Sequence, residues 1–346
     1  MKLHTLIEAF RAFLERQDYR QMTLVGYLED VQQFYTFLKA QLGREPEVGD
    51  LTPEGCKAYL AAQAQRYRRS TLMRRLASLR SFQRFLRTEG HLEVDFVPST
   101  KEVAELLEQA RESQEIVCFD SDELRQIWES MLRAGTPRAI RDLAIIALFV
   151  EWGLPSEWLI RFRADDVNLE HRRLRIPDLV EGAMWVPIRA AHEPLRRYLA
   201  IRDRFNPTSD EHTLFLSQLG RPISRQSLWQ SLRSWGDILR LRKSLTPQVL
   251  RNTAAYRLAQ SQVPPDMLQI VFGHTNPLST RFLLRRLQRA CQSTQAAQLP
   301  ILQPTGEIVM GPGAEAWLPE DLTELRTPAG RGEDDKAEEG EDGKEG

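Results

Sequence analysis

The stretch RRSTLMRRLASLRSFQRFLRTEG, residues 68–90, combines an apolar stripe at helical spacing with a dense series of arginines. Its apolar residues recur every three or four positions, which places them on one face of an α-helix. The pattern predicts a helix that packs this face against a hydrophobic core and leaves the positions between at the surface. The apolar stripe consists of Leu72, Leu76, Leu79, Phe82 and Leu86.

Arginines on the same helix give the strongest charge signal in the chain. Eight arginines and no acidic residue occur between residues 66 and 87. Like charges one helical turn apart repel by roughly 0.2–0.5 kcal/mol per pair, so a surface that binds phosphates is favoured over a solvated arginine face. We therefore expect nucleic-acid contacts from Arg66, Arg68, Arg69, Arg74, Arg75, Arg80, Arg84 and Arg87.

The segments before this helix predict a compact four-helix domain over residues 1–92. Thr52 or Leu51, followed by Pro53, marks one helix start, because proline is favoured at the first helical position. A linker that carries a short helix follows over residues 93–117, since Pro98, Ser99 and a charged stretch interrupt the pattern. Helical spacing is seen at 3–16, 24–40, 53–66 and 70–88.

A second domain over residues 118–295 is predicted to be α+β, mostly helical with a small β-sheet. Asp120 or Ser121 can cap its first helix, and an apolar helix follows at 140–152. Short β-like runs occur at 174–178 and 184–188. Helices are then expected at 190–204, 223–240, 247–260, 264–272 and 278–291.

Net charge divides the chain into two unlike parts. Residues 301–346 hold 13 acidic and 4 basic residues, so residues 1–300 carry a net charge of +8 although the whole chain has −1. From about residue 304 the composition turns to Gly, Pro and Glu, which predicts a disordered acidic tail within a C-terminal segment, 296–346. The apolar run at 299–302 is expected to pack against a catalytic-type domain, its own or a neighbour's; the alternative is a sticky piece of tail.

Several classes of protein are excluded by composition. The sequence has no apolar run that could span a bilayer and no secretion signal at its start. Cys56, Cys118 and Cys291 lie far apart and match no metal-ligand spacing. We therefore expect a cytoplasmic, nucleoid-associated protein without a metal, a cofactor or a membrane partner.

The opening stretch resembles the last helix of the SAM-like core-binding domain of tyrosine recombinases, the family of phage integrases and bacterial chromosome-dimer resolvases. Three later segments resemble the landmarks of the family's catalytic domain, and the resemblance extends over about residues 5–292. It implies a mainly α fold with a DNA-binding domain and a catalytic-type domain. The three segments are ALFVEWGLPSEWLIRFRADDV (147–167), LTPQVLRNTAAYRLAQ (245–260) and FGHTNPLSTRFLLR (272–285).

The resemblance also indicates which catalytic groups are missing. In this family a tyrosine attacks a DNA phosphodiester, arginines and histidines hold the phosphate, and a lysine on a β-turn protonates the leaving oxygen. Arg251 and His274 match two of these groups. Pro155 stands in place of an arginine, Gln248 in place of a histidine, and Leu283 or Leu284 in place of the nucleophile. No lysine occurs from 102 to 242, and no tyrosine follows Tyr256.

The second domain is basic in its own right. Between residues 221 and 265 the one acidic residue, Asp237, faces eight cations, which include Arg257. The last helix adds Arg285, for which a solvated face is an equal alternative. DNA contacts are expected from Arg225, Arg242, Lys243, Arg251 and Arg285.

These features together predict a DNA-binding protein of the recombinase family that lacks catalytic activity and serves as an architectural, regulatory or partner subunit. Its expected partners are double-stranded DNA and either a second copy of itself or an intact recombinase. The alternative is an active recombinase whose nucleophile is Tyr256 or is donated in trans. A pure protein-interaction module is disfavoured by the two acid-poor regions.

Overall fold

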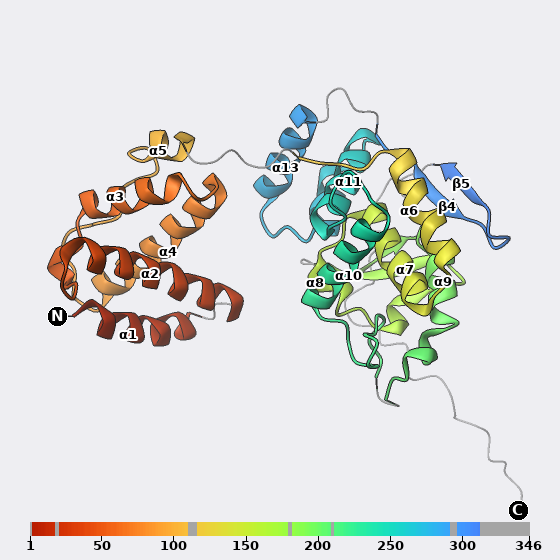
Figure 1. Cartoon of the computed structure of the whole chain (residues 1–346), viewed down its shortest axis with the longest axis horizontal. Helices are drawn as coiled ribbons and strands as arrows, with labels where there is room; N and C mark the ends of the chain where they lie inside the picture. Colours follow the sequence, from red (N-terminus) through yellow and green to blue (C-terminus); the bar gives the residue numbers. More distant parts are fainter. Residues whose placement is uncertain are drawn as a thin grey trace, which may run out of the picture. The chain divides into compact units, whose positions relative to one another are not determined.

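The protein forms two compact units, Met1–Gln114 and Glu115–Gly346, each with its own hydrophobic core (Figure 1). The structure is a computed structural model that describes residues 2–17, 21–109, 116–178, 182–208, 211–290 and 296–311. Both units are built mostly from helices, which confirms the predicted mainly α class. Among these described residues, no helix has the length and apolar character that crossing a membrane requires.

Unit 1 contains the four predicted helices. All five apolar residues of the stripe on α4 are fully buried, and the Phe82 ring meets the Phe10 ring edge-on with centroids 5.1 Å apart. The Thr52 hydroxyl accepts a hydrogen bond from the Gly55 N–H at 3.1 Å and so caps α3, as its sequence predicted. The helices are α1 (Leu3–Arg16), α2 (Gln21–Leu42), α3 (Pro53–Ala64) and α4 (Arg69–Thr88), with a short 3₁₀ helix η1 (Val48–Asp50) before α3.

The segment expected as a linker carries the expected short helix, and it also packs on the core of unit 1. Phe96, Val103 and Leu107 are buried in the core of unit 1, and a short helix α5 (Ala104–Gln109) lies within the segment. The Gln83 side-chain oxygen accepts the N–H groups of two residues of this segment, Phe96 at 2.9 Å and Val97 at 2.7 Å. The chain after α4 is therefore held on the core, and the rest of the expected linker up to residue 115 lies outside the described residues.

Unit 2 begins with a capped helix and continues through a buried one. The Asp120 carboxylate accepts the Glu123 N–H at 2.9 Å, and the Glu123 side chain accepts the Asp120 N–H in return. The helix α7 is buried along most of its length and packs against α9 and α11. The helices in this half are α6 (Ser121–Ala134), α7 (Pro137–Trp152) and α8 (Ser156–Leu159), followed by the 3₁₀ helix η2 (Ala164–Asp166).

A small antiparallel sheet of order β1-β2-β3 separates these helices from the rest of unit 2 along the chain. Ile176 on β2 lies opposite Met184 on β3, and both side chains are buried, which matches the two predicted β runs. The strands are β1 (Val167–Asn168), β2 (Arg173–Asp178) and β3 (Gly182–Pro187). The remaining helices are α9 (His192–Leu199), η3 (Arg202–Phe205), α10 (Arg225–Ile238), α11 (Pro247–Gln260), α12 (Pro265–Val271) and α13 (Pro277–Ala290).

A β-hairpin closes the described part of the chain, formed by β4 (Leu299–Leu302) and β5 (Ile308–Gly311). All four residues of β4 are buried, and the hairpin packs against α6 and α9 of the same unit. This confirms the expected packing of the apolar run and assigns it to its own unit. The hairpin extends unit 2 beyond the expected end at residue 295 and past residue 304, where the tail was expected to begin; residues 312–346 lie outside the described part.

Candidate functional site

The turn that follows α7 brings the first matching segment against the other two. Gly153 has a φ of +67°, and a β-carbon there would lie 3.0 Å from the Phe272 ring and 3.3 Å from Ala254 on α11. A β-carbon on Gly273 would in turn lie 2.7 Å from Pro155. Glycine at both positions therefore allows the turn to pack directly on α11 and on the segment before His274. The three segments converge around Pro155 and Gly273.

Arg251 and His274 lie together at this junction, which we call the Arg251–His274 site. Arg251 Nη2 donates to the Phe272 carbonyl at 2.9 Å, and His274 Nδ1 lies 2.8 Å from the Thr280 hydroxyl. Burial lowers the pKa of Arg251 to about 10, and burial together with the charge of Arg251 lowers the pKa of His274. No ion pair to Arg251 occurs within the described ranges. The site is a desolvated cation without a carboxylate partner in that part of the chain.

Gln248, Leu283 and Tyr256 are three further residues that the sequence singled out for the expected site. Gln248 is exposed and donates its amide to Asn252 at 2.8 Å. Leu283 on α13 is partly buried against the core of unit 2. Tyr256 is 6% exposed and belongs to that core, so most of its side chain is buried.

Two buried ionisable side chains, Arg257 and Glu151, hold the end of α7 in place. The sequence pattern did not identify this structural role. Arg257 on α11 donates to the carbonyls of Val150, at 3.1 Å, and Glu151. The Glu151 carboxylate accepts three backbone N–H groups of the segment before α9, and burial raises its pKa to about 7. Arg257, counted in the basic region from sequence, is 3% exposed and is not available to DNA. The glutamate inside the apolar run ALFVEW was the sequence signal that could have identified this contact between α7 and α11. The three N–H donors are Arg189 (2.7 Å), Ala190 (3.1 Å) and Ala191 (2.9 Å).

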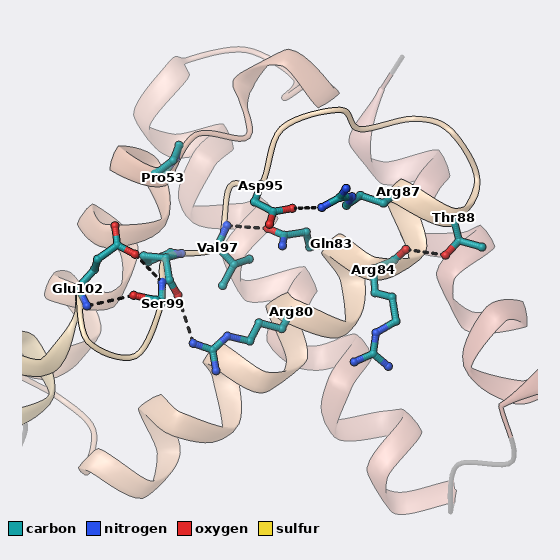
Figure 2. A pocket seen from close by; sticks show the side chains of 11 residues that line it. Pro53, Arg80, Gln83, Arg84, Arg87, Thr88, Asp95, Val97, Ser99 and Glu102 are labelled. Atoms are coloured by element: carbon teal, nitrogen blue, oxygen red, sulfur yellow. Dashed lines mark hydrogen bonds and ion pairs between the residues drawn. The ribbon is translucent and has the colours of Figure 1, made fainter.

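The arginines of α4 divide into paired and unpaired groups along an open pocket of about 770 Å³ (Figure 2). Arg80 donates to the Pro98 carbonyl at 3.2 Å and to Thr100 at 3.0 Å. Arg87 forms an ion pair with Asp95 at 2.9 Å. Arg84 lies between them, and its guanidinium has no partner among the described side chains. Arg80 and Arg87 therefore hold the segment after α4, whereas Arg84 does not.

Asp30 on α2 forms ion pairs with two further arginines of α4. Arg74 forms an ion pair with the buried Asp30 carboxylate. Arg75 is 2% exposed, donates to Gln63 at 2.6 Å, and lies 4.0 Å above the Tyr67 ring. The structure thus corrects the prediction for Arg75, which cannot contact DNA because acids and amides from other helices hold it inside unit 1. Of the eight arginines between residues 66 and 87, the exposed ones without an ion pair to a described residue are Arg66, Arg68, Arg69 and Arg84.

In unit 2 the helix α10 carries a row of exposed residues, of which Arg225 was predicted from the sequence to contact DNA. Arg225, Trp229 and Arg233 follow at i, i+4 and i+8, and all three are exposed. The Arg233 guanidinium lies 5.4 Å from the centre of the Trp229 ring. Trp229 is uncharged, so a count of basic residues does not identify it, although it lies four positions from each of the two arginines. Of the other predicted contacts, Arg242 and Arg285 are exposed, whereas Lys243 is engaged by Glu123 at 2.6 Å.

This chain is similar in sequence to known proteins over both of its units. Residues 7–90 match the N-terminal SAM-like domain of phage integrases, and residues 118–285 match the phage integrase family. Tyrosine recombinase XerC of Roseiflexus castenholzii is 28% identical over 80% of this chain and 87% of its own length. A XerC of a second Roseiflexus strain is 26% identical over 91% of this chain and 98% of its own.

Solved structures show the same fold. The Tn1549 transposon integrase in complex with transposon right-end DNA superposes with a TM-score of 0.65 at 15% identity, over 85% of this chain and 99% of that one. The XerH recombinase bound to its palindromic difH substrate gives a TM-score of 0.62 at 16% identity, over 78% and 79% of the two chains. This chain belongs to the phage integrase, or tyrosine recombinase, family.

Replacing Glu151 with alanine is expected to destabilise unit 2 by about 3–5 kcal/mol, because three buried N–H groups lose their acceptor and Arg257 loses a nearby negative charge. Calorimetric unfolding, which can resolve the transitions of the two units, is the measurement. The control is Glu129→Ala on the exposed face of α6, expected to change stability by less than about 0.5 kcal/mol. Equal stabilities of the two variants would show that Glu151 is not a scaffold residue.

Proposed function

We propose that this protein binds duplex DNA through both units and holds a DNA phosphate in the Arg251–His274 site without cleaving the strand. It then acts as an architectural, regulatory or partner subunit in DNA recombination, a pseudoenzyme of its family. The observation that carries the proposal is the content of the converged site: the partly buried guanidinium of Arg251 and the imidazole of His274, which directly follows the glycine that packs on Pro155.

A phosphate is the ligand whose chemistry fits this site. A buried cation without a counter-ion is costly, and an oxyanion that binds it with charge-assisted hydrogen bonds offsets that cost. His274 can donate a further hydrogen bond from its ring. Exposed arginines on α4 and α10 supply additional phosphate contacts that need no particular base sequence.

Strand cleavage needs three kinds of group, and this site offers only one of them, the donors to the phosphoryl oxygens. The attack requires a nucleophile in line with the leaving oxygen, a proton donor for that oxygen, and donors for the charge that develops on the phosphoryl oxygens. Leu283 carries no nucleophilic atom, and the stretch from residue 102 to 242 has no lysine that could donate the proton. Active-site groups act as a unit, and removing one can cost on the order of 10⁶ in rate.

An active recombinase is the second candidate, because the similar relatives named above are tyrosine recombinases. It requires either Tyr256 or a nucleophile donated by another protomer. Tyr256 would have to leave the core of unit 2 to reach a phosphate, since it is 6% exposed. A lambda integrase dimer bound to its core site is among the similar solved structures, and by analogy a second copy or an intact recombinase is the expected protein partner at the nucleoid.

The protein alone is expected to form no covalent bond with DNA. A nicked suicide substrate, which traps a phosphotyrosine intermediate, should yield no denaturant-resistant adduct with the wild-type protein. The Tyr256→Phe variant is the matched control. An adduct that forms with the wild type and disappears in this variant would make the active recombinase the leading function.

Binding to DNA is expected to strengthen as the pH falls from 8 to 5.5, by about 3–10-fold. The pKa of His274 is lowered in the free protein, so the ring is neutral at pH 7, whereas a phosphate beside it stabilises the protonated form. Binding therefore takes up a proton, and His274→Ala should remove this part of the pH dependence. The control is His171→Ala, an exposed histidine of the β1–β2 turn. A wild-type pH profile retained in His274→Ala would argue against a phosphate in this site.

Exposed and buried arginines of unit 1 should respond differently to substitution. Reversing Arg68, Arg69 and Arg84 to glutamate is expected to weaken duplex binding by at least about tenfold. The slope of log K against log salt should fall by about 0.9 for each phosphate that the variant no longer neutralises. Folding should be unaffected, because none of the three has an ion pair among the described residues. Arg11→Glu, an exposed arginine on α1, is the control. An unchanged salt slope in the triple variant would remove α4 from the DNA surface.

A further inference from the structure

We propose that the acidic C-terminal segment, residues 312–346, binds the basic surface of α10 in the absence of DNA and competes with non-specific duplex for it. The competition rests on the proposed function, whereas the docking of the segment does not. The α10 basic surface is defined by Arg221, Arg225, Arg233, Arg240 and Arg242.

The α10 basic surface carries uncompensated charge. All five arginines are exposed, and none forms an ion pair with a carboxylate of the described residues. Asp237 is the one acidic residue in the sequence between 221 and 242. Neighbouring cations behave differently, since Arg138 is paired with Asp142 at 3.5 Å. The surface therefore repels itself and attracts any flexible polyanion nearby.

The C-terminal segment has the matching composition. Residues 312–346 contain 12 acidic and 4 basic residues, a net charge of −8. Its last 15 residues, GEDDKAEEGEDGKEG, hold eight of these acids and two lysines, and Ala337 is their one apolar residue apart from glycine. Such a run offers carboxylates and little else, so its chemical partner is a cationic surface.

The length of the segment is sufficient to reach this surface. The described chain ends at Gly311 on β5, within unit 2. The last 15 residues begin 21 positions later, and an extended chain of that length spans roughly 70 Å at about 3.3 Å per residue. A globular unit of roughly 200 residues is about 45 Å across. The run can therefore reach any face of unit 2, and its covalent attachment gives it an effective concentration on the order of millimolar.

Competition of this kind acts on selectivity. Non-specific duplex binds by phosphate contacts alone, which a tethered polyanion can replace. A preferred DNA site adds contacts to base edges that carboxylates of the tail cannot reproduce. The segment therefore weakens non-specific binding more than specific binding.

The docking is tested without DNA, by labelling arginines with phenylglyoxal and measuring each position by mass spectrometry. The full chain is compared with a variant of equal length in which the eight acids of residues 332–346 are replaced by Asn or Gln. Arg225 and Arg233 should be labelled about threefold more slowly in the full chain at low salt, and the difference should vanish at about 0.5 M salt. Arg204, an exposed arginine of η3, is the internal control. Equal labelling of Arg225 and Arg233 in both chains would overturn the proposal.

The competition is tested with a duplex of arbitrary sequence. The neutral-tail variant should bind it about tenfold more tightly than the full chain at low salt, and this difference should disappear when Arg225 and Arg233 are both replaced by glutamine. If neither chain binds DNA while their labelling differs, the docking stands and the proposed function fails. If both chains bind DNA equally and label equally, the proposed function stands and this inference fails.

Discussion

The contact between the end of α7 and α11 is the constraint on which the arrangement of unit 2 depends. A helix leaves its last carbonyls without partners, and here the buried Arg257 of α11 binds those of Val150 and Glu151. The Glu151 carboxylate binds three amides of the segment before α9. These two buried charges thus fix α7, α9 and α11 relative to one another. The turn at Gly153 directly follows this contact between α7 and α11. The position of the turn determines where Pro155 meets the segment of His274.

This scaffold does not depend on the groups that would perform strand cleavage. Pro155 fills its place against Gly273 by packing alone, and Gln248 bonds to Asn252 on the same helix. Neither position places a charge in the interior of unit 2 that would need a partner. Arg251 is different, because it keeps a partly buried charge that has no carboxylate partner among the described residues. Its presence is physically consistent with an anionic ligand.

How much could be predicted from sequence follows the range of the interactions involved. The apolar stripe of α4 and the caps of α3 and α6 are set by residues within four positions of one another, and each was predicted correctly. The structural roles of Arg75 and Arg257 were not predicted, because the partners of both residues lie on other helices. Arg257 and Val150, for example, are 107 residues apart. The packing of the expected linker on unit 1 was not predicted for the same reason, since Gln83 binds amides 13 and 14 residues away. The converging segments around Pro155, Arg251 and His274 were identified because the resemblance supplied the long-range information that spacing lacks.

Arginine serves two opposite purposes in this protein, and net charge does not distinguish them. Arg74 and Arg87 are paired with carboxylates, and Arg75 is held inside unit 1, so they add little to the field outside the protein. The arginines of α10 lack such partners among the described residues, and their charge extends into solvent. A count of cations therefore overestimates the binding surface of unit 1 relative to that of unit 2. Because an uncompensated surface attracts any polyanion, the one region of the sequence with a large negative surplus has to be considered as its ligand alongside DNA.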